Sequence, residues 1–92
     1  MQCFVVCFDI SDDRIRYRVG KLLLEYGIRV QRSVFEVSIR SPAQLRRVRE
    51  QIAAALESGD DCRFYPLCRS CRQQATDVND NRIAYQPAAV LI

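Results

Sequence analysis

Apolar and polar positions follow two different periods in the first third of the chain. The run from Cys3 to Ile10 is bulky and almost wholly apolar, which predicts a buried strand whose odd-numbered face ends in Asp9. We expect Ser11 to cap a helix that follows this strand and Gly27 to end it in a left-handed conformation. The helix is predicted from an apolar stripe at helical spacing, which comprises Ile15, Val19, Leu22, Leu23 and Tyr26.

The pattern changes to alternation between Ile28 and Ile39, which predicts strand structure. This stretch contains neither glycine nor proline. The sequence therefore leaves two alternatives open: one long strand, or two short strands with a bend near Arg32-Ser33.

A second helix and a further strand complete the regular pattern. Ser41 and Pro42 are typical of a helix start, and the apolar spacing continues to Ser58-Gly59. The remaining predicted segments are a strand, a polar loop and a last extended piece, which cover Asp61 to Cys68, Arg69 to Arg82 and Ile83 to Ile92.

This order of elements predicts an α+β protein in which a small antiparallel sheet carries both helices on one face. The other face would be left wet in a single chain of this size. We therefore expect two protomers to stack sheet against sheet, or the C-terminal strand to add to a neighbouring chain.

Composition narrows the class of protein. The 92 residues are enough for one small domain, and 49% hydrophobic and 27% charged residues are typical of a globular chain. No apolar run approaches the ~20 residues that span a bilayer, and no basic stretch precedes an apolar one at the N-terminus. We expect a cytoplasmic protein that does not enter a membrane. The absence of histidine excludes histidine-based catalysis.

The five cysteines are odd in number and three of them lie in apolar runs, which argues against a disulfide scaffold. Most are interpreted as small core residues. Cys68 and Cys71 form one Cys-x-x-Cys pair, which supplies two ligands where structural zinc needs four. Two such pairs could complete a site only by meeting in a dimer, so metal binding at this pair stays open.

Arginine dominates the basic residues. The net charge is +3, and thirteen of the fourteen basic residues are arginine, which fits either genome base composition or bidentate recognition of phosphate. Helical spacing places Arg14, Arg18 and Lys21 on one outer stripe of the first helix, with Arg16 to the side.

Asp9 is the strongest candidate for chemistry, because it stands where an apolar strand ends and a helix begins. A carboxylate in that place either binds a metal or partner, or caps local backbone.

Three segments resemble one known family along almost the whole chain, in the expected order: Cys7 to Arg14, Tyr26 to Glu36 and Asp61 to Cys68. They are similar to the small CRISPR-associated protein of the adaptation complex, the second of its two core subunits. The resemblance implies a ferredoxin-like βαββαβ domain over residues 1–82, with residues 83–92 as a C-terminal strand or tail for dimer or partner docking. It also implies a sheet-to-sheet homodimer that assembles with the CRISPR integrase subunit.

The same resemblance implies a metal-dependent nuclease in some members, with Asp9 as catalytic residue and metal ligand. Two Asp9 carboxylates across a twofold axis would suit Mg²⁺, or Mn²⁺, with water completing the shell. The family's nucleic-acid contacts fall on Arg14, Arg16, Arg18 and Arg29. Phe35 matches an aromatic near the family's site, but its pattern favours a core role. Phe8 stands where the family often has tyrosine, so that hydroxyl is missing.

Two classes of function follow. In the first, the protein is an endonuclease that cuts RNA or DNA, and in the second it is an architectural scaffold that holds duplex DNA while the integrase does the chemistry. A more distant alternative is a toxin-like small ribonuclease of related fold. The expected nucleic acids are double-stranded DNA and, in the nuclease interpretation, single-stranded RNA.

Overall fold

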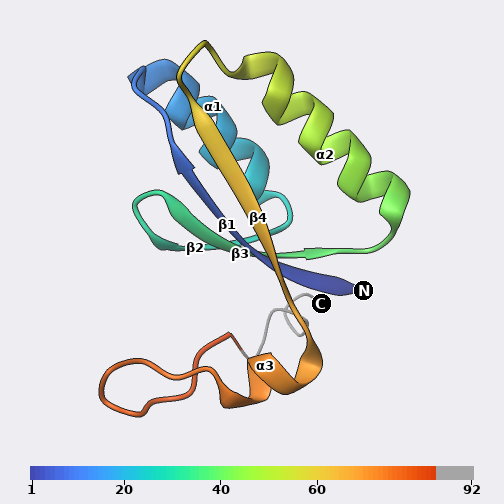
Figure 1. The fold of residues 1–92 in the computed structure, drawn as a ribbon, viewed down its shortest axis with the longest axis vertical. Helices are drawn as coiled ribbons and strands as arrows, with labels where there is room; N and C mark the ends of the chain where they lie inside the picture. The colour runs from blue at the N-terminus through green and yellow to red at the C-terminus, as the bar shows by residue number, and fades with distance from the viewer. Residues whose placement is uncertain (85–92) are drawn as a thin grey trace.

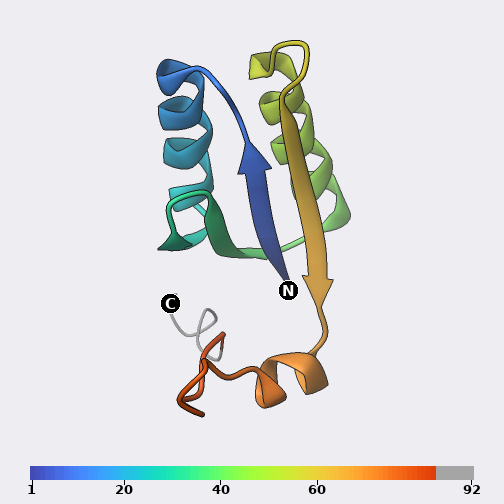
Figure 2. The ribbon, with the colours of Figure 1, turned by 60° about the vertical axis from the view of Figure 1, so that its left-hand side comes forward.

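The computed structural model describes residues 1–84, which form a sheet with two long helices on one face. The elements are β1 (Gln2–Asp9), α1 (Asp13–Leu24), β2 (Gly27–Gln31), β3 (Val34–Ile39), α2 (Pro42–Ala55), β4 (Asp61–Leu67) and α3 (Arg69–Gln74). The strands lie in the order β2-β3-β1-β4 with every neighbouring pair antiparallel. Figures 1 and 2 show α1 and α2 side by side over the sheet and α3 beyond the far end of β4. The predicted ferredoxin-like α+β fold is confirmed.

The core lies between the sheet and the two long helices. In β1 the side chains of Phe4, Val6 and Phe8 are buried against the helices, and the register of β1 with β3 places Val6 opposite Phe35 and Phe4 opposite Val37 on the same face. The side chains with the least exposure come from the sheet and from both long helices and are Phe35, Leu23, Val6, Val19, Val37 and Val48. The apolar residues that alternate along the strands and those that recur every 3.6 residues along the helices therefore pack together in one core.

The first helix begins one residue later than predicted. Asp12, not Ser11, is the N-cap: its carboxylate accepts hydrogen bonds from the backbone N–H of Arg14 at 2.7 Å and of Ile15 at 3.3 Å. Both residue types are good N-caps, but a carboxylate also interacts favourably with the positive end of the helix. These hydrogen bonds lower the pKa of Asp12 below its ordinary value.

Gly27 does not end α1, and the predicted left-handed conformation there is wrong. The helix ends at Leu24, and Gly27 is the first residue of β2; among the described glycines only Gly59 has a positive φ. A Cβ on Gly27 would stand 1.9 Å from the carbonyl oxygen of Glu36 and 2.6 Å from the Cα of Val37. Glycine is needed here because the backbone of β3 lies too close to leave room for a side chain, and the close approach of another backbone is a common reason for glycine in a strand.

The stretch from Ile28 to Ile39 is two strands, which settles the alternative that the sequence left open. The turn lies at Arg32 and Ser33, where the bend was expected. A β-bulge between Arg29 and Gln31 shifts the register of β2 against β3. Bulges of this kind turn side chains away from strict alternation.

The second helix starts as predicted, with Ser41 accepting the Gln44 N–H at 3.1 Å and proline in the first turn. It ends at Ala55, earlier than the predicted Ser58-Gly59, because Leu56 already has an extended backbone. Gly59, at φ +91°, then lies in the turn that leads to β4.

The stretch Arg69 to Arg82 is not wholly a loop, as predicted, because it begins with the short helix α3. A turn follows, in which the Asp77 carboxylate accepts the backbone N–H groups of Asn79 and Asn81 at 2.8 and 2.9 Å. The predicted last strand, Ile83 to Ile92, falls almost entirely outside the described residues; Ile83 and Ala84 are described and are not in a strand.

Candidate functional site

Asp9 is the last residue of β1, and its side chain is exposed on the sheet face away from the helices. The register of β1 with β4 pairs Asp9 with Asp61 and Cys7 with Arg63. The Arg63 guanidinium donates to the Asp61 carboxylate at 2.7 Å. Within residues 1–84, Asp61 thus has a cationic partner, whereas no hydrogen bond or ion pair is recorded for the Asp9 carboxylate.

The loop that follows Asp9 is held from both sides. Arg16 donates through Nη1 to the carbonyl oxygens of Ile10 at 2.7 Å and Ser11 at 3.0 Å, and its other nitrogen pairs with Asp13. From the β4 side, the Asp60 carboxylate accepts the Ser11 N–H at 3.4 Å. Arg16 was predicted as a nucleic-acid contact, and its half-buried guanidinium is here committed to backbone next to Asp9.

These acidic residues can be tested for their fit to a metal. In the part of the chain that the structure describes, no group of three or more histidine, cysteine, aspartate or glutamate side chains could hold an ion. Mg²⁺ needs less than this, since it is often bound by one or two carboxylates and keeps several waters. The exposed Asp9 carboxylate fits such a site once a second carboxylate is supplied. The capping role that the sequence left open for Asp9 is filled by Asp12.

An aromatic stack lies on the helix side of β1. The ring of Phe8 stacks on that of Phe35 with centroids 5.9 Å apart, and the Arg29 guanidinium lies 5.2 Å from the Phe35 centroid. Gly20 on α1 leaves room for Arg29, because a Cβ there would lie 3.0 Å from its Nη2. Phe35 is fully buried, so the core role is the one it has. Arg29 thereby lies against the Phe35 ring and close to Gly20 of α1.

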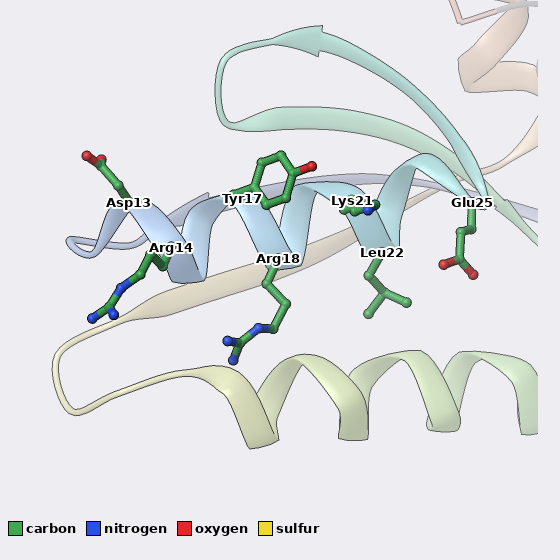
Figure 3. Close-up of a pocket in the computed structure, with 7 residues that line it drawn as sticks. All are labelled: Asp13, Arg14, Tyr17, Arg18, Lys21, Leu22 and Glu25. Carbon is green, nitrogen blue, oxygen red and sulfur yellow. The ribbon is translucent and has the colours of Figure 1, made fainter.

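The outer side of α1 is an exposed basic surface, as the helical spacing predicted. Arg14, Arg18 and Lys21 are exposed on it around a groove of about 630 Å³, and Figure 3 shows Arg14 and Arg18 pointing to the same side of the helix. Tyr17 lies among them, 67% exposed, with the Lys21 ammonium 5.7 Å from its ring centroid. We refer to Arg14, Arg18 and Lys21 as the α1 basic stripe.

The sheet face away from the helices carries apolar side chains around one carboxylate. Glu36 lies opposite Val5 on β1 and opposite Ile28 on β2, and burial raises its pKa above the ordinary value. Part of the C-terminal segment approaches this face, since Arg82 and Ile83 line a groove together with Glu36 and Ile28. We refer to the side chains of Val5, Cys7, Ile28, Val34 and Glu36 as the open sheet face.

Two acidic residues near Asp9 escaped the sequence interpretation. Asp61 was predicted only as the start of a strand and of a segment that resembles the family, and Asp60 was given no role, but the register brings Asp61 opposite Asp9, and Asp60 holds the loop after it. The signal was present as an acidic pair at a strand end. Finding its partner required the strand order, since the two strands are far apart in sequence.

The fold and this site define a small ferredoxin-like domain with an exposed strand-end carboxylate and an arginine-lined helix. The family model described as CRISPR associated protein Cas2 matches residues 1–75, and the chain belongs to this family. A relative in Rhodospirillum rubrum, CRISPR-associated endoribonuclease Cas2 4, is 44% identical over 78 residues, which are 85% of this chain and 63% of that protein. The chain thus spans less than two thirds of that relative's length.

Other relatives match this chain over most or all of their own length. CRISPR-associated endoribonuclease Cas2 1 of Chloroflexus aurantiacus is 40% identical over 79 residues, which are 84% of each chain. Among solved structures, a chain of a partial Cas6-RT-Cas1–Cas2 complex is 36% identical, with a TM-score of 0.84 and complete coverage of both chains. No helix of residues 1–84 is both long and apolar enough to cross a bilayer.

Proposed function

We propose that this protein is a CRISPR adaptation subunit that binds duplex DNA together with the integrase subunit, and that its homodimer is a metal-dependent endonuclease acting on RNA or DNA. The observation that carries the proposal is the exposed Asp9 carboxylate at the end of β1, next to a braced loop, in a chain of this family. Relatives named endoribonucleases support the nuclease activity, and the similar chain in a Cas1–Cas2 complex supports the integrase partner.

The homodimer is part of this proposal for two reasons. The open sheet face exposes apolar side chains that a second sheet would cover, as in stacked-sheet packings. One chain also supplies a single exposed carboxylate without a cationic partner at the end of β1 in the described residues, so two Asp9 side chains from two protomers give the pair that Mg²⁺ accepts. Residues 83–92 are proposed as the tail that docks to the second protomer or to the integrase.

The metal would be held by Asp9. When bound, Mg²⁺ or Mn²⁺ polarises a phosphate and lowers the pKa of a water. The remaining work belongs to the chain itself: Arg16 and Asp60 fix the loop that directly follows Asp9, and Arg63 pairs with the carboxylate of Asp61, which lies opposite Asp9. Preorganisation of this kind spares the site from reorganising during the reaction.

Duplex DNA is proposed to lie along the α1 basic stripe. Arginine guanidinium groups bind phosphate oxygens in bidentate fashion, and α1 presents Arg14 and Arg18 on one side. Phosphate contacts position a duplex without reading its bases, so sequence preference is expected to be weak. Arg29 lies against the Phe35 ring on the helix side of the sheet and would reach only a nucleic acid that passes over the β2 side of α1.

The test is cleavage of labelled duplex DNA and single-stranded RNA by the wild type, by Asp9→Asn and by Glu50→Gln. Each protein is assayed with Mg²⁺, with Mn²⁺ and with chelator. Glu50 is an exposed acidic residue on α2 and serves as the matched control. We expect cutting that needs metal, survives in Glu50→Gln and is lost in Asp9→Asn, with duplex affinity retained in both variants. Cutting by Asp9→Asn at the wild-type rate would remove Asp9 from the site.

The architectural scaffold is the second candidate, and one observation favours it. Phe8, next to Asp9, is buried and stacked on Phe35 and has no hydroxyl that could bind a phosphate or water. If no protein in the same assay cuts under any metal condition while all bind duplex, the scaffold explains the protein and the nuclease proposal fails.

A further inference from the structure

Cys68 and Cys71 lie at the opposite end of β4 from Asp9, where the strand passes into α3. Both thiols are exposed, whereas Cys3 is buried and Cys7 and Cys62 are half-buried. The Cys68 sulfur accepts the backbone N–H of Cys71 at 3.4 Å, so the first side chain folds back toward the second residue. The proposed function uses neither thiol.

We propose that Cys68 and Cys71 are a reversible dithiol–disulfide pair that reacts with low-molecular-weight disulfides of the glutathione class. The reaction requires only these two cysteines and does not depend on nuclease activity or on DNA binding. It is a modification site on the connection between the sheet and the segment that reaches the open sheet face.

The geometry favours an internal disulfide. The two residues are three apart across the first turn of α3, a spacing that brings Cβ atoms to about 5–6 Å on a helix. Disulfides join Cβ atoms roughly 3.5–4.5 Å apart, so a small change at the extended Cys68 residue closes the remaining gap. Because both side chains are exposed, no packed core resists that change.

The two thiols have different reactivities. Hydrogen bonds from the Cys71 backbone N–H and thiol lower the pKa of Cys68, while the hydrogen bond to Cys68 and its charge raise the pKa of Cys71. Burial raises the pKa of Cys62 to about 11. Since the thiolate is the nucleophile, Cys68 is the attacking group and Cys71 the resolving group.

The reaction balances with one disulfide as oxidant. The Cys68 thiolate attacks one sulfur of oxidised glutathione, forms a mixed disulfide and releases one glutathione thiolate. Cys71 then loses its proton to water and attacks the Cys68 sulfur, which forms the Cys68–Cys71 bond and releases the second thiolate. The two cysteines are oxidised, one oxidised glutathione is reduced to two thiols, and the protons lost by the protein end on those thiols at neutral pH.

Metal binding is the competing use of such a pair. Residues 1–84 bring no third histidine, cysteine, aspartate or glutamate to these sulfurs to form a possible ion site. Structural zinc takes four ligands, so the pair in one chain is two short. The unequal thiols also suit exchange chemistry better than a symmetric ligand pair.

The experiment treats the full chain, reduced and metal-free, with oxidised glutathione under native conditions, and follows intact mass and peptide masses. The wild type is expected to lose two hydrogens and to give a Cys68–Cys71 disulfide. Cys71→Ser is expected to trap glutathione on Cys68. Cys68→Ser is expected to take glutathione on Cys71 more slowly than Cys71→Ser takes it on Cys68, because Cys68 accepts the backbone N–H of residue 71 at 3.4 Å and keeps this hydrogen bond in the Cys71→Ser variant.

The proposal is overturned if the wild type forms no Cys68–Cys71 disulfide, or if glutathione reaches Cys7 or Cys62 first. It is also overturned if the two serine variants react at equal rates. A brief treatment of the wild type with iodoacetamide gives a second readout that needs no variant: Cys68 must be alkylated before Cys71.

Discussion

Arg14 and Arg16 are two residues apart on α1 and have opposite surroundings. The Arg14 side chain is 88% exposed and pairs with the nearby Asp12 carboxylate at 3.5 Å. Arg16 is bonded to two backbone carbonyls of the loop after Asp9. Hydrogen bonds from a charged donor to buried or half-buried acceptors are among the stronger ones in proteins, whereas exposed ion pairs contribute little. The same residue type is therefore exposed to solvent at position 14 and holds the backbone of a loop at position 16.

Replacing Arg16 by alanine is expected to lower the free energy of unfolding by roughly 1–3 kcal/mol, because two carbonyls lose a charged donor. Arg14→Ala is the matched control and is expected to change it by less than about 0.5 kcal/mol. Urea denaturation followed by circular dichroism measures both. Equal effects of the two substitutions would show that the carbonyl contacts of Arg16 do not hold the loop.

At this scale the sequence predicted residue types better than residue roles. Asp9 could be singled out as a candidate from sequence, because a charge that ends an apolar run has few structural explanations. Asp61 was not, because its relation to Asp9 exists only through the pairing of β1 with β4. The N-cap was predicted at Ser11 and lies at Asp12 for a similar reason. Two adjacent residues that both make good caps differ in the backbone N–H groups that they can reach, and this depends on where the chain leaves β1.

Helix α1 is an element with two separate surfaces. Its inner side carries Ile15, Val19 and Leu23 into the core, and its outer side carries the α1 basic stripe. This division follows directly from helical periodicity and was predicted from it. The β2 strand is different, because its start is set by a close backbone contact at Gly27 and its register by a bulge. Neither feature leaves a periodic signal in sequence.

Gly27→Ala is expected to destabilise the protein by roughly 3 kcal/mol, because a Cβ cannot fit 1.9 Å from the Glu36 oxygen without parting β2 from β3. Gly59→Ala is the comparison: nothing lies within 4 Å of its Cβ, but its φ of +91° costs a residue with a side chain about 1–2 kcal/mol. Thermal unfolding ranks the two variants. If Gly59→Ala proved the more damaging, the close approach at Gly27 would not be what requires glycine there.

Replacing Arg14 and Arg18 together by glutamine is expected to weaken duplex DNA binding and to flatten its salt dependence. Each phosphate contact contributes about −0.9 to the slope of log affinity against log salt, so two lost contacts per protomer change a dimer's slope by about 4. Arg46 and Arg47, which are exposed on α2, give a control with the same change in charge. Filter binding across a salt series measures the slopes. Equal slopes for the two double variants would mean that DNA responds only to net charge and does not lie along α1.

On the scale of the whole molecule, the two sheet faces are unequal. One is closed by α1 and α2, and the other carries Val5, Ile28 and Val34 around the Glu36 carboxylate. The fold could be predicted because strand and helix periods determine which face the helices cover. The stacking of a second sheet on the other face stays a prediction, since it depends on a surface that only the assembled sheet defines.

Glu36 makes self-association through the open sheet face depend on pH. Burial already raises its pKa from the ordinary 4.5, and a second sheet would bury it further. The charged groups that share its groove are Asp77 and Arg82; hydrogen bonds from Asn81 and Asn79 lower the pKa of Asp77, so Asp77 stays ionised where Glu36 titrates. A raised pKa means that the buried state takes up a proton. The contribution of protonated Glu36 to the stability of the dimer is therefore complete below pH 4.5 and is lost as the pH rises through the raised pKa.

Sedimentation velocity at a series of pH values from 4.5 to 8 is expected to show tighter dimers at the acidic end for the wild type. Glu36→Gln keeps the shape of the side chain and removes its charge, so its dimers are expected to be tighter at pH 8 and to depend less on pH than those of the wild type. Glu50→Gln removes an exposed charge on α2 and is expected to behave like the wild type. If Glu36→Gln kept the wild-type pH dependence, the dimer would form through a surface that leaves Glu36 in water, and the proposed stacking of the two open sheet faces would be wrong.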